Sequence, residues 1–425
     1  MATSAAPLLE TLPGLVNAHT HSPYGPYCRG LTRSAPFEVW MADIMAREAR
    51  ALTPAEVEAC ALVTGLENLA AGNTALIDQH FGPQSQTAIH GAAQAYETLG
   101  LRAWVFVTLS DLPYIAYTRE AYPGFAGAIP ERDLPADLVE MQRPALGAEE
   151  QLARAAGLIR AWRGERVRVG LALSNPVWCS DALLRGAAQL ARELESPLSI
   201  HAEESPLQRA VSLAQWGLSG VGRLAEHGLL GERTLLAHVV QLDEADIALL
   251  ARHRASVSHN PVSNLKLQNG LAPLGRLVRA GVNVCLGSDG HASGDSQNLF
   301  TVLKFVAALA GLNGLRELPE APEHLALRMA IENGRRLWFA GDPERDFLTF
   351  TEPLGPYAPV WDEPAAYLDE VYVDGVPRLA AARARVAASG ARQVVAGLRA
   401  AAAGPDRLER AARWEAPLRA QALSR

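Results

Sequence analysis

Short β-branched segments alternate with longer helical patterns from residue 15 to about residue 340. This alternation is typical of repeated β-α units on a parallel sheet. Eight segments have the composition of buried strands, at 15–19, 74–78, 101–109, 167–174, 197–202, 234–240, 255–260 and 283–289. Eight such units suit closure into a (β/α)8 barrel of the TIM type. A doubly wound open sheet is disfavoured, because no GxGxxG motif follows the first strand.

Two connections are longer than a barrel needs. Segment 24–53 has a helical pattern that suits a cover over a pocket, and segment 111–147 holds several prolines and aromatic residues. Long connections in compact domains are usually functional. We therefore expect segment 111–147 at the catalytic mouth, where barrel enzymes carry their active sites.

The pattern changes past residue 340. Residues 341–380 are expected to form strands with a hairpin turn at Asp374-Gly375, and they belong to no barrel unit. Residues 381–425 are rich in alanine and arginine and are expected to be helical. The sequence thus predicts a barrel over residues 12–340, a small β unit over 341–380 and a helical tail over 381–425.

Charge and composition limit the class of partner. The 425 residues carry a net charge of -7, and the arginines are scattered, so we expect a small-molecule ligand and neither nucleic acid nor membrane. No secretory signal and no membrane-spanning apolar stretch is found, which predicts a cytoplasmic protein. The cysteines are widely separated, without a CxxC pair, which favours reduced thiols over disulfides or a cysteine zinc site.

The first expected strand ends in two histidines, within the stretch "LPGLVNAHTHS". Residues two apart on a strand point to the same face, so His19 and His21 can offer two nitrogens to one metal ion while Thr20 faces away. Alone, the pair is equally well explained as hydrogen-bonded histidines at a strand end. Further ligands must come from other strands.

The carboxyl ends of three other expected strands supply them. His201 ends the fifth strand, His238 the sixth and Asp289 the eighth. Because these ends meet at one rim of a barrel, the sequence predicts a metal site there. Imidazole with one carboxylate suits zinc or iron(II), and the residues leave that choice open.

Five motifs together resemble the amidohydrolase superfamily, namely "PGLVNAHTHS", "SIHAEESP", "AHVV", "SHNPVSNLKL" and "LGSDG". The resemblance is to its deaminase and chlorohydrolase branch, which includes cytosine, guanine and adenosylhomocysteine deaminases, and it covers about residues 12–340. It implies that one metal is held by His19, His21, His201 and Asp289. It places His238 beside the bound water.

The resemblance also implies how the reaction runs. A metal lowers the pKa of a bound water from ~15.7 to ~7, and Asp289 is placed to accept the proton. Glu204, three residues after His201, is expected to protonate a ring nitrogen and then the leaving ammonia. His238 is expected to hold the attacking hydroxide and to stabilise developing charge. Glu203 is expected to be a solvated glutamate at a helix start.

Lysine usage limits the number of metal ions. Relatives with two metals bridge them with a carboxylated lysine from strand four, whereas the two lysines of this chain, Lys266 and Lys304, lie far from that strand. We therefore expect one divalent ion per chain, with zinc preferred and iron(II) as the alternative. The separate cytidine-deaminase architecture is excluded, since its PCxxC motif is missing.

Substrate contacts are assigned to Trp40, Glu48, His80 and Asn175, each with ordinary packing as an equal explanation. Relatives that bind adenine-type rings often carry a histidine before the proline of "LSNPVWCS", where this chain has Asn175. This difference puts an adenosyl substrate in doubt. An asparagine there is still able to hydrogen-bond a polar ring.

The start of the chain also differs from the resembling family. There, a segment before the barrel normally supplies half of a small β-sandwich, whereas here the histidine pair comes almost at once. We expect that half to be lost, trimmed or hidden by a misassigned start. The strands after residue 340 would then lack partners unless another subunit or the helical tail covers them. A homo-oligomer, most simply a dimer, is expected.

The sequence thus predicts a mononuclear metal-dependent deaminase acting on an N-heterocyclic or amidine-like small molecule, with release of ammonia. Within the same chemistry, the alternatives are a chlorohydrolase or aminohydrolase of triazine-like rings and a formimino deiminase. An alternative of another class is a metal-binding barrel module without catalytic activity.

Overall fold

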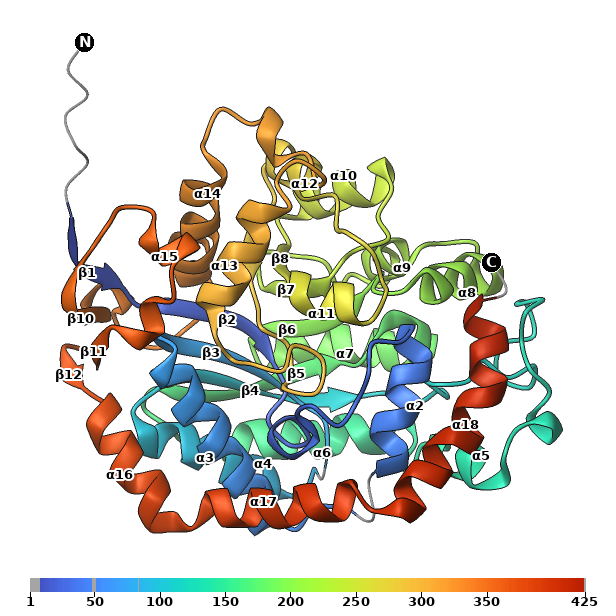
Figure 1. The fold of residues 1–425 in the computed structure, drawn as a ribbon. Helices are drawn as coiled ribbons and strands as arrows, with labels where there is room; N and C mark the ends of the chain where they lie inside the picture. The colour runs from blue at the N-terminus through green and yellow to red at the C-terminus, as the bar shows by residue number, and fades with distance from the viewer. Residues whose placement is uncertain (1–7, 48–50, 83, 424–425) are drawn as a thin grey trace.

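The computed structural model describes residues 8–47, 51–82 and 84–423. Eight parallel strands form a nearly closed barrel in which each strand pairs with the next along the chain (Figure 1), confirming the (β/α)8 prediction. The strands are β2 (Leu15–Thr20), β3 (Asn73–His80), β4 (Arg102–Leu109), β5 (Val167–Leu173), β6 (Leu198–Ala202), β7 (Thr234–His238), β8 (Ser256–His259) and β9 (Asn283–Leu286). Where the ends of the sheet meet, the Asp289 amide donates to the His19 carbonyl at 3.0 Å.

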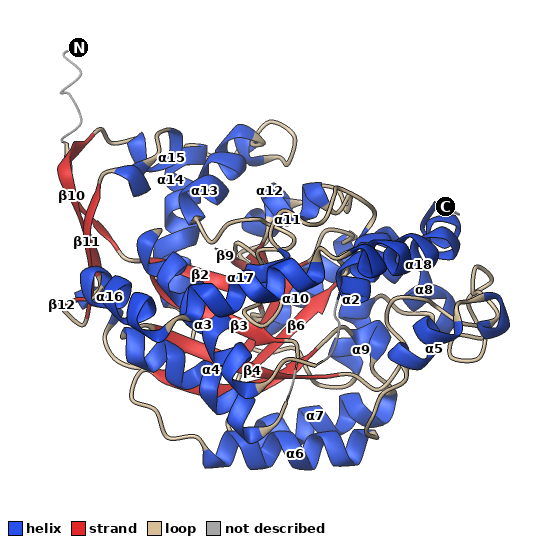
Figure 2. Cartoon of the chain, turned by 60° about the horizontal axis from the view of Figure 1, so that its bottom comes forward, coloured by secondary structure: helices blue, strands red, loops and turns tan. Residues whose placement is uncertain are grey.

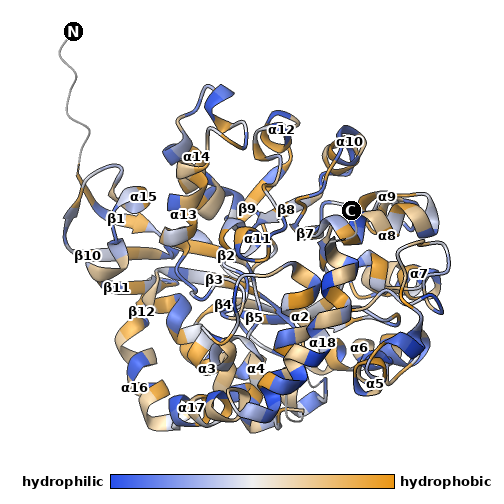
Figure 3. Ribbon diagram, turned by 45° about the vertical axis from the view of Figure 1, so that its right-hand side comes forward, coloured by the Kyte–Doolittle hydropathy of each residue, from blue (hydrophilic) through white to orange (hydrophobic). Residues whose placement is uncertain are grey.

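Helices surround the barrel (Figures 1 and 2). The longest between the strands is α3 (Pro54–Ala70), which begins with a capping box in which Thr53 and Glu56 satisfy each other's backbone amides. Besides three helices described below, the others between barrel strands are α4 (Gln86–Leu99), α6 (Ala148–Ala161), α7 (Asp181–Glu193), α8 (Pro206–Trp216), α9 (Gly220–Glu226), α10 (Glu244–His253), α11 (Pro261–Lys266) and α12 (Leu274–Arg279), and α13 (Leu299–Ala308) and α14 (Pro322–Arg328) follow β9. These helices carry hydrophobic and hydrophilic residues on different faces (Figure 3).

The strands after residue 340 form a second, antiparallel sheet. It has the order β1 (Leu9–Pro13), β10 (Phe347–Leu354), β11 (Leu368–Val373) and β12 (Val376–Pro377). The expectation that these strands lack an N-terminal partner is wrong, because β1 pairs with β10, placing Leu12 opposite Leu348. The division of the chain into 12–340, 341–380 and 381–425 stays a prediction, as does the dimer.

The C-terminal helices form a belt outside the barrel, made of α16 (Leu379–Ser389), α17 (Ala391–Ala402) and α18 (Pro405–Leu423) (Figures 1 and 2). The belt ends against α2 (Phe37–Arg47). Arg33, which precedes α2 in the chain, pairs with Glu415 of α18. Gln421 bonds both the amide and the carbonyl of Tyr117, at 3.3 and 3.0 Å. One helix therefore touches both long connections expected from the sequence.

No helix in the described part of the chain is both long enough and apolar enough to cross a bilayer. The helical insertion expected over 24–53 is present as α1 (Gly25–Cys28) and α2. Segment 111–147 is mostly irregular, with a short helix α5 (Ala136–Gln142). Both segments lie at the end of the barrel where the predicted site residues gather.

A buried arginine joins the small sheet to the barrel. Arg102, at the start of β4, is 0% exposed and binds both carboxylate oxygens of Asp346, at 2.8 and 3.0 Å. It also pairs with Asp374 in the hairpin turn and donates to the carbonyls of Ala340 and Asp342. Such a buried pair is costly to break, because the remaining partner keeps an uncompensated charge.

Replacing Arg102 with alanine should therefore destabilise the protein strongly. We expect Arg102→Ala to lower the free energy of unfolding by about 3–5 kcal/mol, as measured by urea denaturation. Arg132→Ala, which removes an 83% exposed arginine, is the matched control and should change it by less than about 0.5 kcal/mol. Equal small losses in both variants would contradict the structural role of Arg102.

Candidate active site

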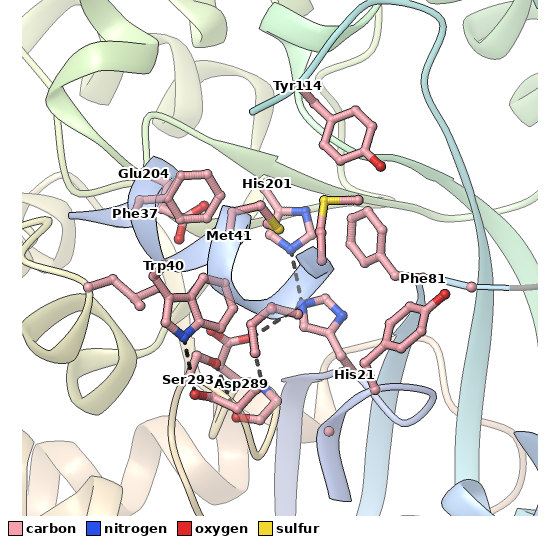
Figure 4. A pocket seen from close by; sticks show the side chains of 18 of the residues that line it. His21, Phe37, Trp40, Met41, Phe81, Tyr114, His201, Glu204, Asp289 and Ser293 are labelled. Carbon is pink, nitrogen blue, oxygen red and sulfur yellow. Dashed lines mark hydrogen bonds and ion pairs between the residues drawn. The ribbon is translucent and has the colours of Figure 1, made fainter. Parts of the chain in front are cut away.

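The predicted metal ligands meet at the carboxyl ends of the barrel strands. His21 Nε2 lies 3.2 Å from Asp289 Oδ1 and 3.3 Å from His201 Nε2, and His19 Nε2 lies 3.6 Å from the same Asp289 oxygen. Figure 4 shows His21, His201 and Asp289 turned toward one another at the wall of a cavity. The structure thus brings together all four side chains expected to hold a metal, His19, His21, His201 and Asp289, which we call the metal-ligand cluster. The His238 ring lies 5.3 Å from that of His19.

Partners behind the histidines fix the direction of each ring. Nδ1 of His21 lies 2.7 Å from the Gln79 carbonyl, and Nδ1 of His201 lies 2.7 Å from the Ser174 carbonyl. A carbonyl only accepts hydrogen bonds, so these Nδ1 atoms carry the protons. The Nε2 atoms of the two rings then point at each other at 3.3 Å, and they repel unless a proton or a cation lies between them.

His19 gives a second reason to place a cation there. The ring is 0% exposed, and neither of its nitrogens has a hydrogen-bond partner. A buried polar atom without a partner costs free energy unless it binds something. Three imidazoles and one carboxylate are a donor set that suits zinc or iron(II). The residues present therefore fit a divalent metal ion.

Protonation of three of the four expected ligands suits metal binding. Burial lowers the pKa of the fourth, His21, but its hydrogen bond and attraction to Asp289 outweigh this and raise it. Burial, followed by the charges of the neighbouring histidines, holds the pKa of His19 and of His201 well below the usual value. Burial raises the pKa of Asp289, but its hydrogen bond and attraction to His21 outweigh this and hold the pKa well below 3.8. Ser263 donates to the other Asp289 oxygen at 2.6 Å. Neutral imidazoles and an ionised carboxylate are the forms that bind metals.

The backbone bends sharply where the site residues leave their strands. His238 and Asp289 have φ angles of 74° and 60°, and Val239 follows at 43°. These values are costly for residues other than glycine, above all for a β-branched valine. The turns aim the two side chains back over the mouth of the barrel. Strain of this kind gathers at functional sites.

Glu204 lies opposite the metal-ligand cluster. Its side chain is 2% exposed, and Oε1 is 3.9 Å from His238 Nε2 and 3.3 Å from Asn269 Nδ2, a hydrogen-bond donor. Burial, together with the negative charges of Asp289 and Glu38, raises the pKa of Glu204 well above 4.5. A carboxyl whose pKa is raised in this way holds its proton more tightly than an exposed glutamate and is suited to act as a general acid.

The neighbouring Glu203 has a different environment. It is 2% exposed, and its carboxylate accepts from Arg209 at 2.8 Å and from the Gly220 amide. The expectation of a solvated glutamate is therefore wrong, because Glu203 leaves its strand with φ of 50° and points into a buried ion pair. Two adjacent carboxyl groups thus face opposite directions.

The predicted substrate contacts divide into three groups. Trp40 lines the pocket beside the metal-ligand cluster, and Glu48 lies outside the described residues. His80 is 0% exposed and is not among the described residues that line the pocket. Asn175 is not among them either, because it accepts from the Val177 amide and donates to Gln208, both at 3.0 Å.

Asn175 instead supports Glu204 from behind. The Gln208 oxygen that accepts from Asn175 also accepts from the Glu204 amide, at 3.1 Å. Gln208 is held in turn by the capping box that Ser205 forms at the start of α8. The asparagine therefore helps to fix the backbone of Glu204 rather than to contact a ligand.

Most of the pocket wall is apolar, and the sequence did not single out its residues. The cavity holds about 450 Å³, and much of its wall comes from Phe37, Met41, Phe81, Tyr114 and Trp178. The aromatic content of segments 24–53 and 111–147 was a signal for Phe37 and Tyr114. Periodicity gave no signal for Met41, Phe81 and Trp178, since an apolar residue in a pocket wall has the same sequence pattern as a core residue.

A comparison with protein families shows to which family the chain belongs. The amidohydrolase family matches residues 11–337, which include the whole metal-ligand cluster. The chain belongs to the amidohydrolase family. This confirms the resemblance drawn from the five motifs.

Named relatives of this amidohydrolase are deaminases. It is 34% identical over 325 residues to the 5-methylthioadenosine/S-adenosylhomocysteine deaminase of Thermococcus kodakarensis, covering 76% of this chain and 68% of the relative. It is 32% identical over 329 residues, with the same coverage, to the 5'-deoxyadenosine deaminase of Methanothermobacter thermautotrophicus. The predicted reaction class, hydrolytic deamination by an enzyme, is confirmed.

Solved structures agree in fold. An adenosine deaminase from Xanthomonas campestris with bound zinc superposes with a TM-score of 0.73 at 28% identity, over 92% of this chain and 86% of that one. An atrazine chlorohydrolase from Arthrobacter aurescens in complex with zinc gives a TM-score of 0.75 at 21% identity, over 91% and 88%, which is a likeness of fold alone. The zinc in the first structure and the cluster described above support a divalent metal in this amidohydrolase.

Asp289 offers a direct test of the metal site. Asp289→Asn removes the anionic oxygen that faces the three histidines, so metal affinity should fall by about tenfold or more, as metal-site substitutions usually do. The loss of affinity is measured as the metal content that remains after dialysis against a weak chelator, determined by elemental analysis. His324→Gln, at an exposed histidine, is the control and should keep wild-type metal content. Equal metal content in Asp289→Asn and the control would remove Asp289 from the site.

Proposed function

We propose that this amidohydrolase is a zinc-dependent deaminase that binds one metal ion and replaces an exocyclic amine on an N-heterocyclic small molecule with oxygen, releasing ammonia. The observation that carries the proposal is Glu204, a buried carboxyl with a raised pKa that faces the metal-ligand cluster across the pocket. An amine leaves only after it has gained a proton, and Glu204 is placed to supply one.

His19, His21, His201 and Asp289 would hold the ion. Bound there, a divalent metal acts as a Lewis acid and makes hydroxide available at neutral pH. Two observations support a single ion. Lys266 is bound to the Ala292 carbonyl and Asp295, and Lys304 to Glu363, so neither lysine is placed to bridge a pair of metals.

The chain's own side chains would divide the proton transfers between them. Asp289 accepts the proton of the attacking water, since Oδ1, which also accepts from the Gly290 amide at 2.8 Å, faces His19 and His21. His238 keeps its Nδ1 proton toward Asn264 Oδ1 at 2.9 Å, which leaves Nε2 to accept a hydrogen bond and orient the water. Glu204 donates its proton to a ring nitrogen, making the adjacent carbon electrophilic. It then relays the proton that Asp289 took from the water to the departing amine, and it regains a proton from the new hydroxyl group as the carbonyl forms and ammonia leaves.

Glu204→Gln tests this assignment. The substitution keeps the shape and the hydrogen bond to Asn269 but removes the transferable proton, so kcat should fall by about 10²- to 10⁴-fold while metal content is unchanged. Glu165→Gln, at an 86% exposed glutamate, is the matched control and should keep wild-type activity. Normal turnover in Glu204→Gln would refute the proton-carrier role.

A release assay identifies the reacting ring. Ammonia is measured after incubation of the zinc-loaded protein with aminopurines, aminopyrimidines, pterins, aminotriazines and formimino compounds. We expect ammonia from at least one ring with an exocyclic amine. Chloride release from a chlorotriazine without ammonia from any amine would favour the chlorohydrolase alternative, and inactivity with bound metal would favour a binding module.

A further inference from the structure

Two chemically different sets of residues line the active-site pocket. The set that we call the polar side consists of the metal-ligand cluster with Glu204 and His238. The set that we call the apolar arm consists of Phe37, Trp40, Met41, Met45, Tyr114 and Trp178. Figure 4 shows Phe37, Trp40 and Met41 on one side of the cavity and Tyr114 on another, around His21 and His201.

The cavity is larger than the proposed reaction needs. Its volume of about 450 Å³ lies in the range of pockets that enclose drug-sized ligands, which have several rings or a ring with substituents. The reacting ring must lie against the metal-ligand cluster and Glu204. A substituent on that ring therefore has to occupy the apolar arm.

The polar atoms of the apolar arm already have partners within the protein. Trp40 Nε1 donates to Thr32 Oγ1 at 3.1 Å and lies 3.3 Å from the Ala292 carbonyl. Trp178 Nε1 donates to Tyr117 Oη at 3.3 Å. Both indole N–H groups thus have acceptors within the protein, and the Tyr114 hydroxyl lies 3.7 Å from Met141 Sδ. A ligand hydroxyl buried against these rings loses its hydrogen bonds to water without replacement.

A nearby carboxylate is also turned away. Glu38 belongs to α2, the helix that carries most of the apolar arm, and is 2% exposed. Its Oε1 accepts from Ser205 Oγ at 2.6 Å, and Glu38 is not among the described residues that line the pocket. Among those residues, the charged groups lie on the polar side, with none in the apolar arm to bind a ribose diol, a carboxylate or an ammonium.

The arm is a packed aromatic surface rather than a loose gap. The Phe37 ring stacks on Trp178 with centroids 6.0 Å apart and an interplanar angle of 17°, and Tyr114 lies 5.8 Å from Trp178. Met41 and Met45 add flexible thioethers that adapt to ligand shape. Aromatic faces and methionines together bind flat or branched apolar groups well.

We infer that the substrate is an amino-N-heterocycle whose substituent is apolar, an alkyl or aryl group without hydroxyl or charge, and that the apolar arm selects it over the corresponding nucleoside. This inference rests on the proposed deaminase function. It separates the chain from the relatives whose names specify adenosine derivatives.

Paired ligands on two rings test the inference. The pairs are 9-benzyladenine with adenosine and 1-benzylcytosine with cytidine, offered to the zinc-loaded full-length protein. Affinity is measured by titration calorimetry, and kcat/KM by ammonia release. We expect the benzyl compound of at least one pair to be preferred by about 10- to 100-fold, the range over which apolar pockets discriminate against added hydroxyls.

Substitution within the arm gives the second measurement. Met41→Gln and Met45→Gln nearly preserve side-chain volume but add an amide to the arm, and should each reduce the benzyl preference by about fivefold or more without loss of metal. Leu312→Gln, at a 74% exposed leucine outside the pocket, is the matched control and should leave the preference unchanged.

The outcomes separate the inference from the function. Ammonia release with nucleosides preferred, or with no preference, overturns the inference and leaves the deaminase standing. Selective binding of the benzyl compounds without ammonia from any amine supports the apolar arm and overturns the deaminase. No binding of either benzyl compound, or a preference that survives both methionine substitutions, overturns the role given to the arm.

Discussion

The site depends on one physical constraint, the crowding of imidazole nitrogens around one carboxylate. The Gln79 and Ser174 carbonyls accept from Nδ1 of His21 and His201, so the Nε2 atoms of the two rings point at each other at 3.3 Å and repel unless a proton or a cation lies between them. His19 adds a ring buried without any partner. A cation resolves this repulsion, which ties the chemistry of the barrel mouth to the backbone carbonyls behind it.

The adjacent carboxyl groups of Glu203 and Glu204 lie in different environments. Glu203 is ionically paired with Arg209 and braces the start of α9 through the Gly220 amide, whereas Glu204 is surrounded by negative charge and apolar surface. A positive φ at Glu203 turns the chain between them. Sequence neighbours thus acquire different partners because the backbone directs them into different surroundings, an ion pair for Glu203 and the pocket for Glu204.

Much of this could be predicted from sequence, for physical reasons. The barrel strands and the ligands at their ends depend on local periodicity and on parallel topology, so His19, His21, His201 and Asp289 could be grouped before their geometry was known. The contacts of Asn175 and the partner of β10 depend on packing between distant segments, which no local pattern records. For the same reason the apolar arm was predicted only through Trp40 and the two unusually long connections, and Trp178, which lies in neither connection, was not predicted.

The belt of C-terminal helices gives these connections a common anchor. Helix α18 packs along α2 and fastens the backbone of segment 111–147 through Gln421, while the expected metal ligands lie in the barrel strands or within three residues of their ends. The reaction centre and the walls that surround its ligand are thus built on separate scaffolds. Substitutions in the belt can reshape what the cavity admits without disturbing the chemistry, which leaves this barrel open to acquiring new substrates through its periphery.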